Sequence, residues 1–135
     1  MLSTPDIAVQ FDNESTSIDF PAEGVTSSAI VTELGERLFR LDSVPIFAES
    51  ASFGDVIEAD RVKAGTLRFL CVVRSGGWRT FFFLLSNEDR TSRRIASVLE
   101  RVERGGGHWE RVFGGCLFIC LPPGTEWDPT ADVLG

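Results

Sequence analysis

One segment of this chain has the period of an amphipathic helix, and nearly all the rest has the period of strands. Between Asn87 and Arg104, four apolar residues recur at positions i, i+3, i+4 and i+7: Ile95, Val98, Leu99 and Val102. This stripe predicts a helix that packs one face against a core. A cap at Asn87, Asp89 or Thr91 would start the helix, and Gly105 would stop it in a left-handed conformation.

Segments with strand patterns flank this helix on both sides. They are residues 7–11, 28–33, 37–41, 56–59, 67–74 and 78–85 before it, and 108–113 and 116–121 after it. Because Phe81 to Leu84 is apolar on both faces, the strand at 78–85 is expected to be central and covered on both sides. This order predicts an antiparallel, β-rich α+β fold of about seven or eight strands, with one main helix at about 90–104 packed on the sheet.

The length and composition predict a single domain. The 135 residues are 43% hydrophobic and 24% charged, which is close to the globular average, and such a chain buries about two thirds of its unfolded surface. Residues 1–135 are therefore expected to form one domain around one core. No secretory signal pattern and no apolar run of membrane-spanning length occurs. We expect a cytoplasmic protein with no membrane partner, and the oligomeric state stays open.

The cysteines are expected to be free thiols in the core. Cys71, Cys116 and Cys120 all lie in apolar surroundings, and their odd number fits a reducing compartment. Cys116 and Cys120 are four residues apart on one predicted strand. This separation is roughly 13 Å, which is too far for a disulfide.

No catalytic, metal-binding or phosphate-binding signature is present. His108 is the only histidine, no Gly-x-Ser-x-Gly motif accompanies it, and thiols in a core are not activated nucleophiles. One histidine cannot complete a tetrahedral zinc site, and no Asp-x-Asp-x-Asp loop is present for a hard cation. The glycines at 105–107 follow a helix and do not open one, so they form no phosphate loop. We predict no catalytic residue, no metal and no cofactor, and we favour a protein that is not an enzyme.

The charge of the chain is uneven. Residues 1–60 hold twelve acids and two bases, a balance of −10, and residues 61–135 hold eleven bases and eight acids, a balance of +3, which gives −7 in total. The acidic part disfavours a nucleic-acid partner and would attract a basic protein. The alternative is that it only keeps the chain in solution. Five arginines on the predicted helix form either a solvated face or an anion-binding patch: Arg90, Arg93, Arg94, Arg101 and Arg104.

Two functional hypotheses from different classes follow. The first is a non-enzymatic acidic binding module that neutralises or regulates a basic protein partner, as immunity proteins do. Its predicted contact residues are five acids and one tryptophan: Asp42, Glu49, Asp55, Glu58, Asp60 and Trp109. The second is a small-molecule binder or an enzyme that uses a groove near Asp55 and Ser75. Asp55 follows a turn glycine, so its carboxylate would either face this groove or close an Asx-type turn.

The middle of the chain carries an ordered series of motifs. Phe39-Arg40-Leu41 leads to Val44-Pro45-Ile46-Phe47, Gly54-Asp55-Val56-Ile57 follows, and Val72-Val73-Arg74-Ser75-Gly76 comes next. After the helix, a strand ends in Pro122-Pro123. Over about residues 28–123 this series resembles the bacterial "domain of unknown function 4265" family, although Ile46 separates Pro45 from Phe47 and the C-terminal tail is short. The resemblance implies an architecture and a bacterial origin, and it implies no activity.

Overall fold

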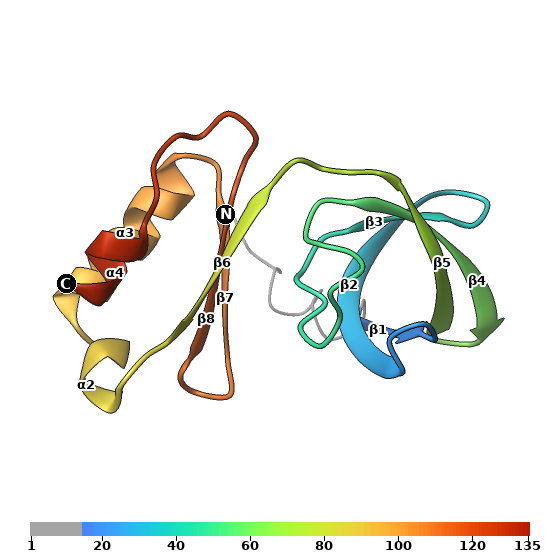
Figure 1. Cartoon of the computed structure of the whole chain (residues 1–135), viewed down its shortest axis with the longest axis horizontal. Helices are drawn as coiled ribbons and strands as arrows, with labels where there is room; N and C mark the ends of the chain where they lie inside the picture. Colours follow the sequence, from blue (N-terminus) through green and yellow to red (C-terminus); the bar gives the residue numbers. More distant parts are fainter. Residues whose placement is uncertain (1–14) are drawn as a thin grey trace, which may run out of the picture. The chain divides into compact units, whose positions relative to one another are not determined.

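The chain divides into two compact units that meet at Gly76 and Gly77. The structure, a computed structural model, describes residues 15–135. We call residues 15–76 the barrel unit and residues 77–135 the sheet–helix unit. The described residues are mostly β, with eight strands and three short helices (Figure 1). The strand predicted at residues 7–11 lies outside the described residues.

The barrel unit is a closed barrel of five strands that follow one another around the ring. They are β1 (Ser15–Phe20), β2 (Val25–Gly35), β3 (Leu38–Leu41), β4 (Val56–Lys63) and β5 (Thr66–Arg74). Each strand pairs antiparallel with the next, and β1 pairs parallel with β5. The prediction of purely antiparallel pairing is therefore wrong at this seam. In a ring of five alternating strands the first and the last run in the same direction, so the closing pair has to be parallel.

The barrel encloses its own hydrophobic cluster. Its fully buried side chains include Ile18 and Phe20 from β1, Leu41 from β3, Ile57 from β4 and Leu67 from β5. Burial of each large apolar side chain contributes about 1.5–3 kcal/mol to folding before the entropy cost. Every strand of the ring contributes at least one buried residue to this cluster, so the strands stabilise one another.

Cys71 is exposed, and its prediction as a core thiol is wrong. The ladder between β4 and β5 contains register shifts, one of them at Glu58 and Ala59. Phe69 pairs with the buried Ala59, whereas Cys71 pairs with the neighbouring Glu58. A β-bulge of this kind moves the following side chains to the other face. The Cys71 thiol consequently lies outside and donates to Glu58 Oε1 at 3.7 Å.

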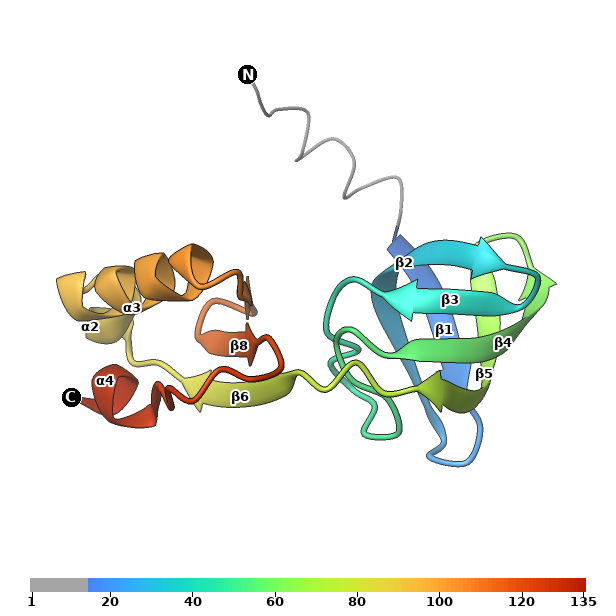
Figure 2. The same cartoon turned by 90° about the horizontal axis from the view of Figure 1, so that it is seen from above.

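The sheet–helix unit is a three-stranded sheet with helices on one face. Its elements are β6 (Arg79–Leu84), α2 (Asn87–Arg90), α3 (Arg93–Arg104), β7 (His108–Val112), β8 (Cys116–Leu121) and α4 (Thr130–Leu134). Strand β8 is central, and β6 and β7 flank it antiparallel. Figures 1 and 2 show α3 and α4 against this sheet, and side chains from both helices join one cluster with β6 and β8.

Strand β6 lies at the edge of its sheet, so the prediction of a central strand covered on both sides is wrong. Phe81 and Phe83 pack toward the helices, whereas Phe82 and Leu84 are 51% and 75% exposed. The apolar pattern of β6 matched a doubly covered strand, but β8 holds that central position with Leu117, Ile119 and Leu121 buried. Among the described residues, the helices cover one face of this sheet only.

Helix α3 forms where the period predicted it, with a different start and stop. Ile95, Val98, Leu99 and Val102 are all buried. The cap is Ser92, whose hydroxyl accepts from the Ile95 amide at 3.2 Å, and the segment 87–90 forms the separate helix α2 behind its own cap, Ser86. The predicted caps Asn87, Asp89 and Thr91 are thus wrong. The left-handed residue after α3 is Gly106, with φ of 79°, and not Gly105.

The buried apolar residues form two clusters, one in each unit, where the sequence predicted one core. The inward-facing side chains of the barrel strands form the first cluster. In the second cluster, the apolar face of α3 packs against β6, β8 and Val133 of α4. Among residues 15–135, no helix is both long and apolar enough to cross a membrane.

The loop between β3 and β4 is attached to the β1–β2 turn by one carboxylate. Glu23 accepts from the amides of Glu49 (2.9 Å) and Ser50 (2.8 Å) and from the Ser50 hydroxyl. The Ser50 hydroxyl first, and then the Glu49 amide, lower the pKa of Glu23 below its usual value. A lowered pKa in the folded state means that the carboxylate stabilises this loop above its unfolded pKa, and that the contribution is lost as pH falls through the folded pKa.

Glu23→Gln should therefore loosen this loop at neutral pH and leave the rest of the barrel in place. We expect faster hydrogen exchange at the amides of Glu49 and Ser50 than in the wild type, with the difference shrinking in acid as Glu23 becomes protonated. Comparison of exchange protection at each pH by NMR measures this. Equal protection of both amides in the two proteins at neutral pH would contradict the assignment.

Candidate ligand pocket

The acids predicted to contact a basic partner are largely engaged within the chain. Asp42 accepts from Arg40 Nε at 2.7 Å and from the Thr32 hydroxyl. Glu58 and Asp60 lie 3.4 and 3.1 Å from Arg37. A second base, Arg68, also reaches Asp60, at 3.3 Å. The exposed side chain of Glu49 has no such partner among the described residues. Exposed pairs of this kind are individually weak, yet they leave less charge available to another protein.

Asp55 is a buried carboxylate at the end of the β3–β4 loop. The residue is 7% exposed, and its carboxylate accepts from the Ser52 amide at 2.9 Å and from the Gly76 amide at 2.8 Å. Ser75, which was predicted to line a groove with Asp55, is exposed on the surface. Neither residue lines any of the pockets described below. The two oxygens of Asp55 thus connect the β3–β4 loop to the end of β5.

Trp109 belongs to the other unit. It is half-buried on β7, packs against the cluster under α3, and donates from its indole nitrogen to Glu103 Oε2 at 2.9 Å. The six predicted contact residues therefore divide between the two units. That they form one surface for a basic protein stays a prediction.

His108, Glu110 and Cys120 occupy neighbouring positions on the sheet face that α3 does not cover. His108 Nε2 lies 2.7 Å from Glu110 Oε2, and Cys120 is the register partner of both His108 and Thr80. Burial raises the pKa of the Cys120 thiol to about 11, with the Glu110 charge adding to the rise and the Thr80 hydroxyl opposing it. Because the thiolate is the nucleophile, this environment suits a structural thiol and not a catalytic one. No group of three or more potential metal ligands gathers within residues 15–135.

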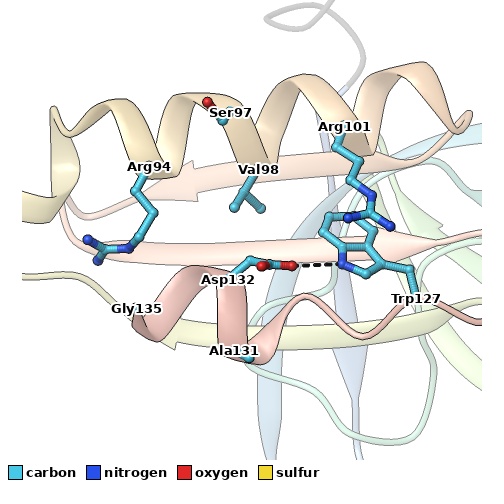
Figure 3. Close-up of a pocket in the computed structure, with 8 residues that line it drawn as sticks. All are labelled: Arg94, Ser97, Val98, Arg101, Trp127, Ala131, Asp132 and Gly135. Atoms are coloured by element: carbon cyan, nitrogen blue, oxygen red, sulfur yellow. Dashed lines mark hydrogen bonds between the residues drawn. The ribbon is translucent and has the colours of Figure 1, made fainter.

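A ligand-sized pocket lies between α3 and the C-terminal segment, by which we mean residues 125–135. Its volume is about 380 Å³, and ligand pockets commonly measure roughly 300–1,000 Å³. Arg94, Val98 and Arg101 of α3 form one wall, and Trp127 and Asp132 of the C-terminal segment form the other (Figure 3). The residues of α3 recur every three or four positions, so they share one helix face.

Two arginines hold the C-terminal segment in place. Arg79 of β6 donates to the carbonyl oxygens of Thr125 and Trp127, each at 2.6 Å. Arg94 donates to the Val133 carbonyl at 3.0 Å and to Asp89 Oδ1 at 2.9 Å. The guanidinium of Arg94 is therefore largely engaged in closing the pocket at one end.

Arg101 is held differently. Its guanidinium carbon lies 4.1 Å from the centroid of the Trp127 ring, and the Trp127 indole nitrogen donates to Asp132 Oδ2 at 2.9 Å (Figure 3). Stacking on an aromatic face orients a guanidinium without using its N–H groups. Within residues 15–135, no carboxylate lies within ion-pair distance of Arg101. The pocket thus presents an oriented set of donors beside the apolar surfaces of Val98 and Trp127.

The sequence contained one signal for this site, the arginine-rich face of the helix, for which a solvated face and an anion-binding patch were both left open. It contained no signal for the opposite wall. Trp127 and Asp132 lie 26 and 31 residues beyond Arg101 and reach it only through the fold.

Comparison with known proteins decides the family. Residues 28–135 match the family described as "Domain of unknown function (DUF4265)". The chain belongs to this family. The resemblance stated from the motifs is therefore confirmed, and the match also covers the residues after 123. In this DUF4265 chain the whole pocket, including Trp127 and α4, lies within the matched residues.

A solved structure has a similar fold. It is described as "Novel crystal structure of a hypothetical protein from Neisseria gonorrhoeae" and gives a TM-score of 0.61 at 14% identity, covering 89% of this chain and 83% of that one. At this identity the likeness concerns the fold alone. No curated protein matches the chain.

Proposed function

We propose that the sheet–helix unit binds a small anionic ligand with an apolar body in the pocket between α3 and the C-terminal segment. The observation that carries this proposal is the guanidinium of Arg101. Its central carbon lies 4.1 Å from the centroid of the Trp127 ring, at the wall of a pocket of about 380 Å³, and no carboxylate pairs with it among the described residues.

The other charged groups of the pocket are engaged within the chain, which leaves Arg101 as the group that would bind an anion. Arg94 donates to a carbonyl and to Asp89, and Asp132 accepts from Trp127. A carboxylate that enters the pocket would therefore find its donors on Arg101. The parallel N–H groups of a guanidinium can donate to both oxygens of one carboxylate, so the ion pair also fixes the orientation of the ligand.

The lining favours binding over reaction. Ser97 supplies the hydroxyl and Asp132 the carboxylate of the pocket lining, which includes no histidine and no cysteine within the described range. The apolar part of the lining comes from Val98, Ala131 and the ring of Trp127. Such a surface suits an alkyl or aromatic body attached to the anion. This supports a ligand-binding protein.

Arg101→Ala should lower the affinity for a carboxylate probe by roughly tenfold or more, since a hydrogen bond to a charged group is worth about 1.5–3 kcal/mol. The probe is octanoate, with octanol as its uncharged counterpart. Binding is measured by tryptophan fluorescence, because Trp127 lines the pocket, and by the shift of the thermal midpoint. We expect the wild type to bind octanoate and to bind octanol much more weakly.

Arg93→Ala is the matched control. Arg93 is an exposed arginine of the same helix that lines none of the pockets described here, so its removal changes the net charge equally. It should leave octanoate binding unchanged, and Arg101→Lys should retain only part of it because the fork and the stacking are lost. Equal octanoate affinity in Arg101→Ala and the wild type, or equal affinity for octanol and octanoate, would remove the proposal.

A further inference from the structure

A second hollow, of about 350 Å³, lies beside the C-terminal end of α3. Arg101, Val102 and Arg104 line it from the helix, and Thr125 and Trp127 line it from the C-terminal segment. Arg101 and Trp127 also line the first pocket, so the two cavities share this stacked pair. Among residues 15–135, no acid lines the second hollow.

Arg101 and Arg104 are close enough to bind one compact anion together. They are three positions apart on α3, which corresponds to a rise of about 4.5 Å along the helix axis. Residues at this spacing are neighbours on one helix face, and both arginines line the second hollow. Their guanidinium groups can therefore donate to different oxygens of the same anion.

The donors of both arginines are free to take part in such a site. Within the described part of the chain, no carboxylate lies within ion-pair distance of Arg101. Arg104 lies 3.8 Å from Glu100, but both side chains are largely exposed, and an exposed pair of this kind is weak. Thr125 adds a hydroxyl group to the lining, which is a further donor.

The end of the helix does not cancel this positive charge. A helix C-terminus carries about −0.5 of an elementary charge, whereas each of the two guanidinium groups carries a full positive charge. The last carbonyl groups of α3 are also engaged, because those of residues 101–103 accept from the amides of residues 105–107. The charge of the two arginines therefore dominates the hollow.

We propose that the second hollow binds the phosphoryl group of a small molecule, with Arg101 and Arg104 donating to its oxygens. A phosphoryl group is compact, carries about two negative charges and has three acceptor oxygens. It matches two neighbouring guanidinium groups better than a carboxylate, whose two oxygens are satisfied by one. Val102, Leu121 and the Trp127 ring form an apolar surface beside it, where the rest of a phosphate monoester would lie.

This site is distinct from the pocket of the proposed function, although Arg101 contributes to both. A guanidinium has five N–H groups, so one arginine has donors enough for two neighbouring anions. Arg104, in contrast, lines only the second hollow. The two sites can therefore be tested separately through Arg104.

Phenyl phosphate and inorganic phosphate are the probes, used at constant ionic strength and at a pH of about 8, where a phosphate monoester is a dianion. Binding is measured by tryptophan fluorescence, because Trp127 lines the hollow, and by the line width of the phosphorus NMR signal. We expect saturable binding by the wild type. Tighter binding of phenyl phosphate would identify a monoester as the ligand, and equal binding would identify free phosphate.

Arg104→Ala should lower the affinity for both phosphate probes by roughly tenfold or more and leave octanoate binding unchanged. Arg101→Ala should weaken the binding of phosphate and of octanoate. Arg93→Ala removes an equal charge from the same helix outside the hollow, so it should bind phosphate as the wild type does. Thermal midpoints measured without ligand establish that each variant is folded.

Three results would overturn the phosphate site, whether or not octanoate binds. They are no saturable binding of either phosphate probe, equal affinity in the wild type and Arg104→Ala, and an equal loss in Arg93→Ala and Arg104→Ala. Phosphate binding that depends on Arg104, in a protein that does not bind octanoate, would remove the proposed function and leave the phosphate site standing.

Discussion

Gly76→Ala should destabilise the barrel unit by about 2–4 kcal/mol. A Cβ atom at Gly76 would lie 2.4 Å from the Gly54 carbonyl oxygen, a backbone atom that cannot turn away. The backbone would have to shift, which costs about 1–3 kcal/mol for an overpacked site. The same shift would weaken the bond from the Gly76 amide to Asp55 Oδ1, and a bond to a charged group is worth about 1.5–3 kcal/mol.

Hydrogen exchange over residues 15–76 measures this effect. All three tryptophans, Trp78, Trp109 and Trp127, lie in the sheet–helix unit, so fluorescence reports only on that unit. We expect protection to fall in β3, β4 and β5. Gly35→Ala is the control, because a Cβ there meets only Leu38 at 4.0 Å. If Gly35→Ala and Gly76→Ala lost protection equally, the close approach of Gly76 and Gly54 would not be the cause.

Asp55→Asn should reproduce much of the loss without any added volume. One of the two backbone amides that now faces a carboxylate oxygen would face an amide NH₂ group, so a buried donor would be left unsatisfied. A barrel that kept its full protection in this variant would contradict the structural role of Asp55.

The sheet–helix unit should lose about 3 kcal/mol of stability in alkali because of Cys120, with about 2 kcal/mol of this loss between pH 9 and pH 11. Burial raises the pKa of this thiol in the folded chain from 9.0 to about 11, and each pKa unit corresponds to about 1.4 kcal/mol. Above pH 9 the unfolded chain releases the proton while the folded chain retains it, so stability falls as pH rises. The loss is complete once the folded thiol also ionises.

Urea unfolding followed by tryptophan fluorescence at several pH values tests this. Cys120→Ala should flatten the dependence on pH in the alkaline range, whatever its effect on stability at neutral pH. Cys116→Ala removes a thiol from the same strand and should keep the wild-type slope, because Cys120 is still present. An unchanged alkaline slope in Cys120→Ala would show that another group causes the loss.

Features that depend on neighbours in the sequence could be predicted without coordinates. The apolar stripe of α3 and most strand positions follow from the spacing of apolar residues along the chain. The hairpin turn before β8 follows from its two adjacent glycines. The motif series around Pro45 and Gly54-Asp55 pointed to the DUF4265 family, which the comparison confirms. The helix caps were missed because several polar residues precede α3, and only the backbone path selects Ser92.

The candidate site could be located only from the tertiary structure. The arginines of α3 were visible in the sequence, but their roles were not. Arg94 closes the pocket through Val133, whereas Arg101 stacks on Trp127. Both contacts join residues more than 25 positions apart. Among the acids predicted to contact a partner, Asp55 was likewise indistinguishable by sequence from the others. In the structure it is buried, and its carboxylate accepts from the amides of Ser52 and Gly76.

The sequence alone determined that this chain is β-rich, that it has an amphipathic helix near residues 93–104, and to which family it is similar, because these properties depend on local order and on motifs. The tertiary structure decided the closure of the barrel by a parallel pair, the division into two hydrophobic clusters, the edge position of β6 and the pocket beside α3. The physical reason is the same in each case. Pairing and packing between distant residues select one of several faces or partners that a local pattern leaves equivalent.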